Sequence, residues 1–309
     1  MPTLSEAADQ VPLCTLSIAA LCIFLQVYVT LADTPLSNFT VVAVNVIYLG
    51  EYYRIISAAL LHGSLMHIAF NMMSFLSIGA NLERSIGTLA LFFTVLWSII
   101  LGGVIYVGAE WAMTMWVTND PGYAYQQAIG FSGVIFTLAL MESYRSTQPT
   151  RLVFGMVQVP TRMYPWVLLI VLSVVIPGIS FMGHLSGILV GVLHVYGVTK
   201  PLLPSTAHYA EMESYEWLRH NIGQRRNFVA CPLALPTTGA EPPPSSASLR
   251  QSCGSLCVSI GTARRSLHAF ASNTAAGVRG WRNGEAGAGA RDTPAGGVEA
   301  SGRLLNPRT

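Results

Sequence analysis

ALLHGSLMHIAFNMMSFLSIGA, residues 59–80, is apolar over a length that suits a membrane-spanning helix. An α-helix needs about 20 apolar residues to cross the hydrocarbon core of a bilayer. The stretch nevertheless carries His62, His67 and Asn71 toward its N-terminal end. Ionisable and amide side chains inside a membrane are costly, so they are functional candidates by default. This one segment therefore predicts both a membrane protein and a polar site within the membrane.

The composition supports the same conclusion. Of the 309 residues, 52% are hydrophobic and 10% are charged, and the mean hydropathy is +0.49. Soluble domains carry about 25% charged residues. The formal net charge of +2 is the sum over an apolar region with few charges and a polar tail. It therefore gives no indication of nucleic-acid binding. No spacing of Cys and His completes a zinc site, and we expect neither a metal nor an organic cofactor.

Apolar segments predict an all-α, polytopic bundle of six transmembrane helices. They are residues 13–31, 59–80, 89–108, 128–141, 166–177 and 181–198. Residues 39–49 are apolar but short, which suits an interfacial or re-entrant element. The predicted domains are an N-terminal segment, 1–12, a six-helix domain, 13–199, and a largely disordered tail, 200–309, with Pro-rich and Gly-rich runs. Within the tail, residues 209–226 suit either a short amphipathic helix or a partly ordered linker.

The basic residues predict the orientation, because loops on the cytosolic side are enriched in Lys and Arg. With the N-terminus in the cytosol, sixteen of the seventeen Lys and Arg residues face the cytosol, and only Arg54 faces outward. Both termini are therefore predicted to be cytosolic.

Two further polar motifs lie at the N-terminal ends of spans. Ser132 stands in Gly-Phe-Ser-Gly at the start of the fourth, and His184 in Gly-His-Leu-Ser-Gly at the start of the sixth. The second, fourth and sixth spans run in the same direction, so their N-terminal ends share one membrane face. The three motifs are thus expected to converge on one buried site.

These residue types suit acyl transfer by a serine. A serine hydroxyl becomes nucleophilic when a base lies within hydrogen-bond reach, and His184 can supply that base for Ser132. His67 and Asn71 are four residues apart, hence on one helical face, and can stabilise an oxyanion together with the Ser132 backbone N–H. No Asp lies inside a span, so a Ser–His dyad is predicted rather than a triad. The same absence excludes an aspartyl intramembrane protease.

Small residues frame these groups. Gly130 and Gly133 flank Ser132, and Gly187 follows His184 by three residues, which allows helices to approach closely. Each motif also has a structural explanation. Small residues are common at helix contacts, His184 alone suits a hydrogen-bonded bundle histidine, and the residue 62–71 motif suits a metal half-site or a packing network.

Taken together, four motifs resemble those of the rhomboid proteases and occur in the same order. They are His62-Gly-Ser-Leu-Met-His67-Ile-Ala-Phe-Asn71, Asn81-Leu82-Glu83-Arg84-Ser85-Ile86-Gly87, Gly130-Phe131-Ser132-Gly133 and Gly183-His184-Leu-Ser-Gly187. The resemblance covers about residues 52–196 and implies a six-helix core with a Ser132–His184 dyad. It implies oxyanion support from His67 and Asn71, with His62 as a further histidine of the same helix. Glu83 and Arg84 correspond to a structural acidic–basic pair at the cytosolic end of that helix.

Two positions depart from the family pattern. Tyr53-Arg54 stands where the family has Trp-Arg, which keeps an amphipathic aromatic ring beside an Arg. Phe136 stands where many relatives have Tyr, which retains a ring to stack on His184 but loses the hydroxyl. We expect neither change to abolish activity. The sequence around Ser132 and His184 is most similar to that of the rhomboid-4 subgroup. This resemblance implies a location in the endoplasmic reticulum or another endomembrane.

The resemblance implies an intramembrane serine endopeptidase that cleaves transmembrane segments of membrane proteins near their luminal end. The expected partners are these substrates and the lipid bilayer; a partner of the tail is unknown. One alternative is an inactive relative that binds membrane clients for degradation, although such proteins typically lose the Ser or the His. Another is a small transporter or channel, which inverted repeats or a charged pathway would support; the sequence shows neither.

Overall fold

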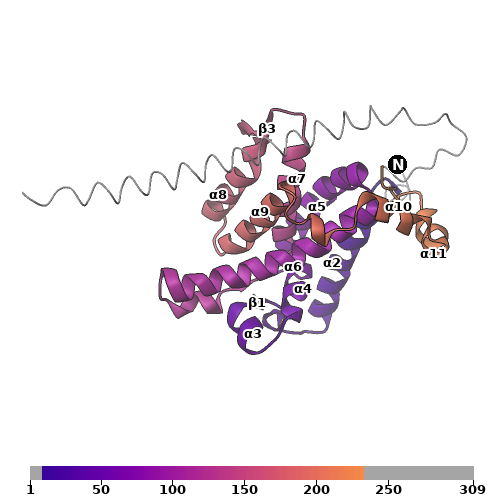
Figure 1. Ribbon diagram of the computed structural model, residues 1–309. Helices are drawn as coiled ribbons and strands as arrows, with labels where there is room; N and C mark the ends of the chain where they lie inside the picture. Colours follow the sequence, from indigo (N-terminus) through magenta and orange to yellow (C-terminus); the bar gives the residue numbers. More distant parts are fainter. Residues whose placement is uncertain (1–8, 233–309) are drawn as a thin grey trace, which may run out of the picture. The chain divides into compact units, whose positions relative to one another are not determined.

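The computed structural model describes residues 9–232, which fold mostly into helices (Figure 1). The α-helices are α2 (Leu13–Leu31), α3 (Ala43–Tyr48), α4 (Tyr53–Leu60), α5 (Leu65–Ile86), α6 (Thr88–Ala112), α7 (Ser132–Arg145), α8 (Tyr164–Val175), α9 (Phe181–Val195), α10 (Thr206–Ser214) and α11 (Glu216–Leu218). Two antiparallel strand pairs join them: β1 (Val41–Val42) with β2 (Gln127–Ala128), and β3 (Thr150–Val153) with β4 (Val157–Pro160).

A helix lies at each of the six predicted spans, but the helices differ in length. Within residues 9–232, three are long and apolar enough to cross a membrane: Leu13–Leu31, Leu65–Ile86 and Thr88–Val117. Phe181–Val195 and Lys200–Ser214 form a pair bent by 90°, which is a fourth span if the pair is counted as one broken helix. The α7 and α8 helices are shorter than the usual spanning length. The fold is therefore a helical membrane bundle. Helix length and apolarity alone support three or four membrane spans, not the six that were predicted.

The second predicted span begins later than its apolar pattern suggests. Residues 53–60 form the separate helix α4, and α5 begins only after Ser64, whose hydroxyl accepts a hydrogen bond from the His67 N–H at 3.1 Å. Such a side-chain cap satisfies an otherwise free N–H of the first turn. His62 consequently lies in the connection before the helix, whereas His67 and Asn71 lie in α5. The helix ends at Gly87, whose φ of +97° favours glycine.

A fully buried carboxylate joins the first three long helices. The two oxygens of Glu83 accept hydrogen bonds from the Cys14 N–H, the Thr15 N–H and hydroxyl, and the Thr88 hydroxyl, all at 2.7–2.8 Å. Cys14 and Thr15 are in the first turn of α2, where N–H groups lack partners within the helix. The negative charge also complements the positive end of the helix dipole. Glu83 therefore fixes α5 against the starts of α2 and α6.

Arg84 has a different partner from its neighbour. Its guanidinium donates to the Gln10 carbonyl at 2.8 Å, just before α2. The acidic and basic residues of this motif thus both tie α5 to the segment that begins α2, through different atoms.

The part of the predicted tail within the described residues also contacts the bundle. The Leu13 N–H donates to the Asn227 carbonyl at 2.8 Å, and the Thr88 N–H donates to the Val229 carbonyl at 2.7 Å. Residues 206–223 form α10, α11 and a π-helical turn, so the segment predicted as an amphipathic helix or a linker is helical over part of its length. The remainder of the tail, residues 233–309, lies outside the described residues, as do residues 1–8.

The loop after α2 is organised by a buried arginine. The Arg54 guanidinium donates to the carbonyls of Ser37 and Thr40 at 2.8 and 3.0 Å and forms an ion pair with Glu51. Hydrogen bonds from Asn45 and from Arg54 hold the pKa of Glu51 below its usual range. The short apolar segment within residues 39–49 forms β1 and α3 around this arginine.

A hairpin connects α7 to α8, and its turn has an unusual residue. The Met156 N–H donates to the Val153 carbonyl at 3.0 Å across Phe154 and Gly155, whose φ values are +50° and +72°. Positive φ at both central residues defines a type I′ turn, which favours Asn-Gly. A residue with a Cβ costs about 1–2 kcal/mol in this conformation, so Phe154 is a poor choice for the turn itself.

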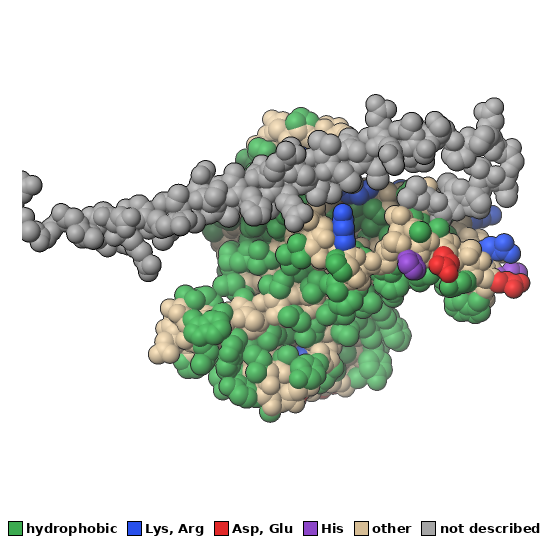
Figure 2. Space-filling view, in the orientation of Figure 1, with side chains coloured by type: hydrophobic (Ala, Val, Ile, Leu, Met, Phe, Trp, Pro, Cys, Tyr) green, Lys and Arg blue, Asp and Glu red, His purple; other side chains and the backbone are tan. Residues whose placement is uncertain are grey.

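The surface matches a protein embedded in lipid. Hydrophobic side chains cover most of the visible face, and charged side chains of both signs gather around α10 and α11 (Figure 2). Large apolar side chains such as Phe24, Phe70, Phe92 and Val174 are exposed. These observations support a membrane protein.

Replacing Glu83 by Gln tests the role of the buried carboxylate. The amide has one acceptor oxygen instead of two, so buried donors at the start of α2 lose their partner. We expect the free energy of unfolding to fall by about 3 kcal/mol, measured as a lower thermal unfolding midpoint in detergent. The exposed Glu216→Gln is the control, and equal midpoints for the two variants would contradict the assignment.

Candidate active site

Ser132 is the first residue of α7, and the turn before it is held from two sides. The β1–β2 pairing fixes the incoming chain, and the Gly130 N–H donates to the Ala58 carbonyl at 2.7 Å. Gly130 has a φ of +124°, and a Cβ there would lie 2.6 Å from the His67 ring. Glycine is thus required at position 130 for two reasons: its φ is positive, and a Cβ would collide with the His67 ring.

The structure brings Ser132 and His184 together. Ser180 caps α9 by accepting a hydrogen bond from the Gly183 N–H at 3.0 Å, which sets the start of the helix. His184 then lies in the first turn, and its Nε2 is 2.8 Å from Ser132 Oγ. This is a hydrogen-bond distance. His184 is buried, whereas Ser132 is partly exposed.

The two helices approach at their glycines. A Cβ at Gly187 would collide with the Gly133 carbonyl, so only glycine permits this separation. Thr137, which is buried, donates its hydroxyl to the Gly187 carbonyl at 2.7 Å. The same hydroxyl lies 3.2 Å from the Gly133 carbonyl. The α7–α9 contact is the most extensive between helices in the described part of the chain.

The His184 ring is oriented by packing. Phe136 lies with its ring centroid 4.8 Å from that of His184, at an interplanar angle of 36°. The Nδ1 atom of His184 is buried and has no hydrogen-bond partner among residues 9–232. Within the described residues, no carboxylate therefore forms a hydrogen bond with Nδ1 of His184.

His67 and Asn71 lie one turn apart on α5, as their spacing predicts. The His67 Nδ1 accepts a hydrogen bond from the Gly63 N–H at 3.4 Å, which leaves Nε2 to carry the proton. The hypothetical Cβ of Gly130 would lie 2.7 Å from this Nε2, so the donor faces the turn that leads to Ser132. Asn71 is buried and donates one amide hydrogen to the His67 carbonyl at 2.8 Å. No hydrogen bond joins Asn71 to Ser132.

His62 contacts the same turn from another side. It is fully buried, and its Nε2 accepts a hydrogen bond from the Phe131 N–H at 3.4 Å. Its ring packs edge-on against His67, with centroids 5.2 Å apart. Its own N–H donates to the Gln26 side chain at 2.8 Å. His62 therefore lies where it holds the residue before Ser132.

Sequence patterns missed some residues that build the site. Thr137 bridges the two helices, and Gln26 and Ser64 fix the histidine segment. The available signal for Thr137 was a polar residue inside an apolar span, five residues after Ser132. Gln26 gave a similar signal within the first span. Among residues 9–232, no group of three or more His, Cys, Asp or Glu side chains is arranged to hold a metal ion.

The sequence of this chain is similar to those of known proteins. A family model described as the Rhomboid domain matches residues 49–201. The chain is similar to Rhomboid-like protein 15 of Arabidopsis thaliana, with 34% identity over 229 residues, 71% of this chain and 53% of that protein. It is also similar to Rhomboid-related protein 4 of Homo sapiens, with 32% identity over 157 residues, 51% of this chain and 49% of that protein.

A relative with an enzymatic name is matched as well. Rhomboid-type serine protease 2 of Gibberella zeae is 33% identical over 156 residues, 49% of this chain and 55% of that protein. The chain spans about half the length of these curated relatives.

Gly187→Ala tests whether the glycine contact sets the distance between Ser132 and His184. The added methyl group pushes α9 away from α7, and a displacement of about 1 Å at a reacting group costs roughly a hundredfold in rate. We therefore expect a fluorophosphonate probe to label Ser132 about a hundredfold more slowly. Gly102→Ala, where a Cβ meets open space, is the control. Unchanged labelling of Gly187→Ala would show that the contact does not set the geometry.

Proposed function

The chain belongs to the rhomboid family, and from that premise we propose that it is an intramembrane serine endopeptidase. The observation that carries the proposal is the 2.8 Å separation of His184 Nε2 and Ser132 Oγ. It occurs between two different helices at a buried position, where an accidental polar contact is costly.

In the proposed mechanism, His184 acts as the general base. Its Nε2 accepts the proton of Ser132 as the hydroxyl oxygen attacks the scissile carbonyl of a substrate peptide bond. The protonated imidazole then gives this proton to the leaving amine, which produces an acyl-enzyme. Water repeats the sequence on the ester and releases the second product. Phe136 and the α7–α9 contact keep the imidazole in place through both steps.

The negative charge that develops on the carbonyl oxygen needs donors. The Ser132 N–H is free at the start of α7, where the helix dipole also favours an anion. The Gly63 hydrogen bond to His67 Nδ1 favours the tautomer with the proton on Nε2, and Nε2 lies beside the Gly130 turn. We assign oxyanion stabilisation to these two groups and to the Asn71 amide on the same face of α5. His62 acts as a positioning residue through its hydrogen bond to the Phe131 N–H.

The membrane arrangement is part of the proposal. The six helices α2, α5, α6, α7, α8 and α9 cross or enter the bilayer, with the short ones accommodated by local thinning. Both termini face the cytosol, because that orientation puts sixteen of seventeen basic residues inside. The site then opens to the luminal side of the endoplasmic reticulum or another endomembrane.

The proposed substrates are transmembrane segments of membrane proteins, cleaved near their luminal ends. A spanning helix has all its backbone groups paired, so a substrate must unwind locally before Ser132 can reach a carbonyl. The loop over residues 33–58 and helix α8 flank the bundle and form the proposed lateral entrance.

Ser132→Ala and His184→Ala test the reaction. Each variant loses either the nucleophile or its base, so we expect cleavage of a model transmembrane substrate in proteoliposomes to fall by at least about a thousandfold. The thermal unfolding midpoints should stay close to that of the unmodified protein. Ser98→Ala in α6 and His208→Ala in α10 are matched controls that should retain cleavage.

Equal cleavage by Ser132→Ala would refute the serine mechanism. Client binding by the unmodified protein without any cleavage would favour the inactive, client-binding alternative. Neither result affects the fold described above.

A further inference from the structure

The β3–β4 hairpin exposes an apolar tip. The strands pair from Thr150 with Pro160 to Val153 with Val157. Large apolar side chains at and beside the turn are exposed by more than half: Leu152 55%, Phe154 58%, Met156 79% and Val157 57%. Clustered exposed apolar side chains indicate an interaction site.

The conformation of the turn is also unfavourable for the residue that occupies it. Phe154 occupies a position with positive φ that Asn, Asp or Gly fills at lower energy. A bulky ring at this position is unfavourable for the turn and is left without cover on the hairpin. A partner that buries the ring accounts for both features at once.

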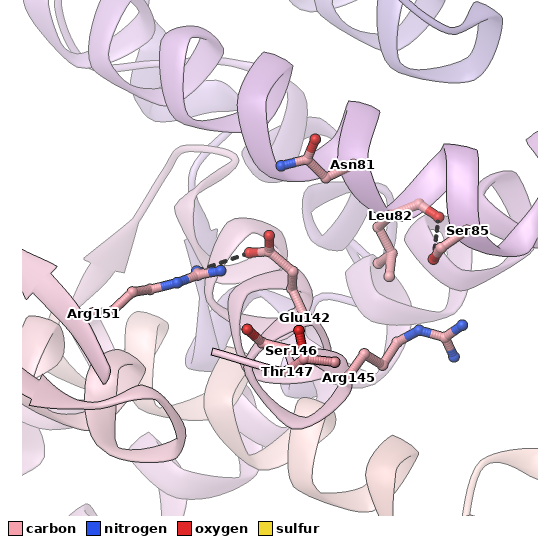
Figure 3. Close-up of a pocket in the computed structure, with 8 residues that line it drawn as sticks. All are labelled: Asn81, Leu82, Ser85, Glu142, Arg145, Ser146, Thr147 and Arg151. Carbon is pink, nitrogen blue, oxygen red and sulfur yellow. Dashed lines mark hydrogen bonds and ion pairs between the residues drawn. The ribbon is translucent and has the colours of Figure 1, made fainter. Parts of the chain in front are cut away.

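Basic side chains lie at the base of the hairpin, away from its turn. A cavity of about 360 Å³ separates the end of α5 from the end of α7 and the start of β3 (Figure 3). Arg145 and Arg151 lie on opposite flanks of Glu142, and Asn81 projects from α5 above them. Glu142 pairs with Arg151 at 2.9 Å, whereas no acidic side chain among residues 9–232 is within ion-pair distance of Arg145. The cavity therefore keeps one uncompensated positive charge.

A second cavity adjoins the first and extends the basic surface. It shares Ser146 and Thr147 with the first and is also lined by Arg162, whose guanidinium lies over the Tyr144 ring at 5.2 Å. Hydroxyl groups beside cations suit the oxygens of a phosphate.

The position of the hairpin favours a lipid over a protein as the partner. After the hairpin, Met163 and the α8 residues Ile170 and Val174 are also at least half exposed. Apolar side chains beside basic ones suit a membrane interface, where the apolar groups enter the acyl boundary and the cations attract anionic lipids. Basic pockets between membrane helices suit anionic lipid headgroups.

We propose that residues 150–160 form a lipid-binding element of the leaflet at the C-terminal end of α7. Phe154, Met156 and their apolar neighbours enter the acyl region. Arg145 binds the phosphate of one anionic phospholipid in the cavity between α5 and α7. This proposal does not depend on the chemistry of Ser132.

Photo-crosslinking identifies what covers the tip. The full chain carries benzoylphenylalanine in place of Phe154 or, as a control, in place of the exposed Trp217. It is irradiated in proteoliposomes of phosphatidylcholine with phosphatidylserine, and the adducts are identified by mass spectrometry. We expect lipid adducts at position 154 in clear excess over position 217. A protein adduct, or no excess of lipid adducts, would overturn the proposal.

Thermal shifts in detergent separate lipid from free phosphate. Added phosphatidylserine should raise the unfolding midpoint, whereas phosphatidylcholine and inorganic phosphate should not. Arg145→Gln should weaken the apparent affinity for phosphatidylserine about fivefold, and Arg219→Gln should leave it unchanged. Equal shifts with inorganic phosphate, or equal losses in both Arg variants, would contradict a specific lipid site.

Phe154→Asn provides the sharpest variant, because Asn suits the type I′ turn. It should keep the hairpin folded and the midpoint without lipid at least as high. It should nevertheless lower the shift caused by phosphatidylserine. An undiminished shift would show that the ring does not contact lipid.

Discussion

The close approach of α7 and α9 is the constraint on which the candidate site depends. Gly187 lies against the Gly133 carbonyl, and the Thr137 hydroxyl donates to the Gly187 carbonyl across the contact. None of these three residues takes part in the proposed reaction, yet together they bring Ser132 within hydrogen-bond distance of His184. In a membrane no hydrophobic effect draws helices together, so close backbone packing and interhelical hydrogen bonds provide the attraction. The same contact therefore stabilises the bundle and sets the separation of Ser132 and His184.

Buried polar side chains elsewhere bind backbone groups that helices and loops leave free. Glu83 accepts from the first turn of α2, and Arg54 donates to carbonyls of the loop after that helix. His62 accepts from the Phe131 N–H just before α7. Unpaired backbone groups cost several kcal/mol in an apolar environment, so each of these side chains fixes a chain segment in place. Several of the costly polar residues of this membrane protein thus serve to pair backbone groups outside regular helices.

The bundle has two polar regions, one at each end of α7. Ser132 and His184 lie at the N-terminal ends of their helices, where free N–H groups favour a developing anion. Arg145 is the last residue of α7, and it lines a cavity together with Arg151 at the base of the β3–β4 hairpin. We propose a reaction at one end of this helix and contact with the surrounding lipid at the other.

The sequence by itself determined the membrane class, the presence of a helix at each of the six predicted spans, and the convergence of Ser132 and His184. These follow from local apolar length and from the shared direction of alternate spans, which need no knowledge of packing. The tertiary structure decided the boundary of α5 at Ser64, the partners of Glu83, and the bridging role of Thr137. Those features depend on contacts between residues distant in the chain, and a linear pattern of polarity does not record which buried donor meets which acceptor.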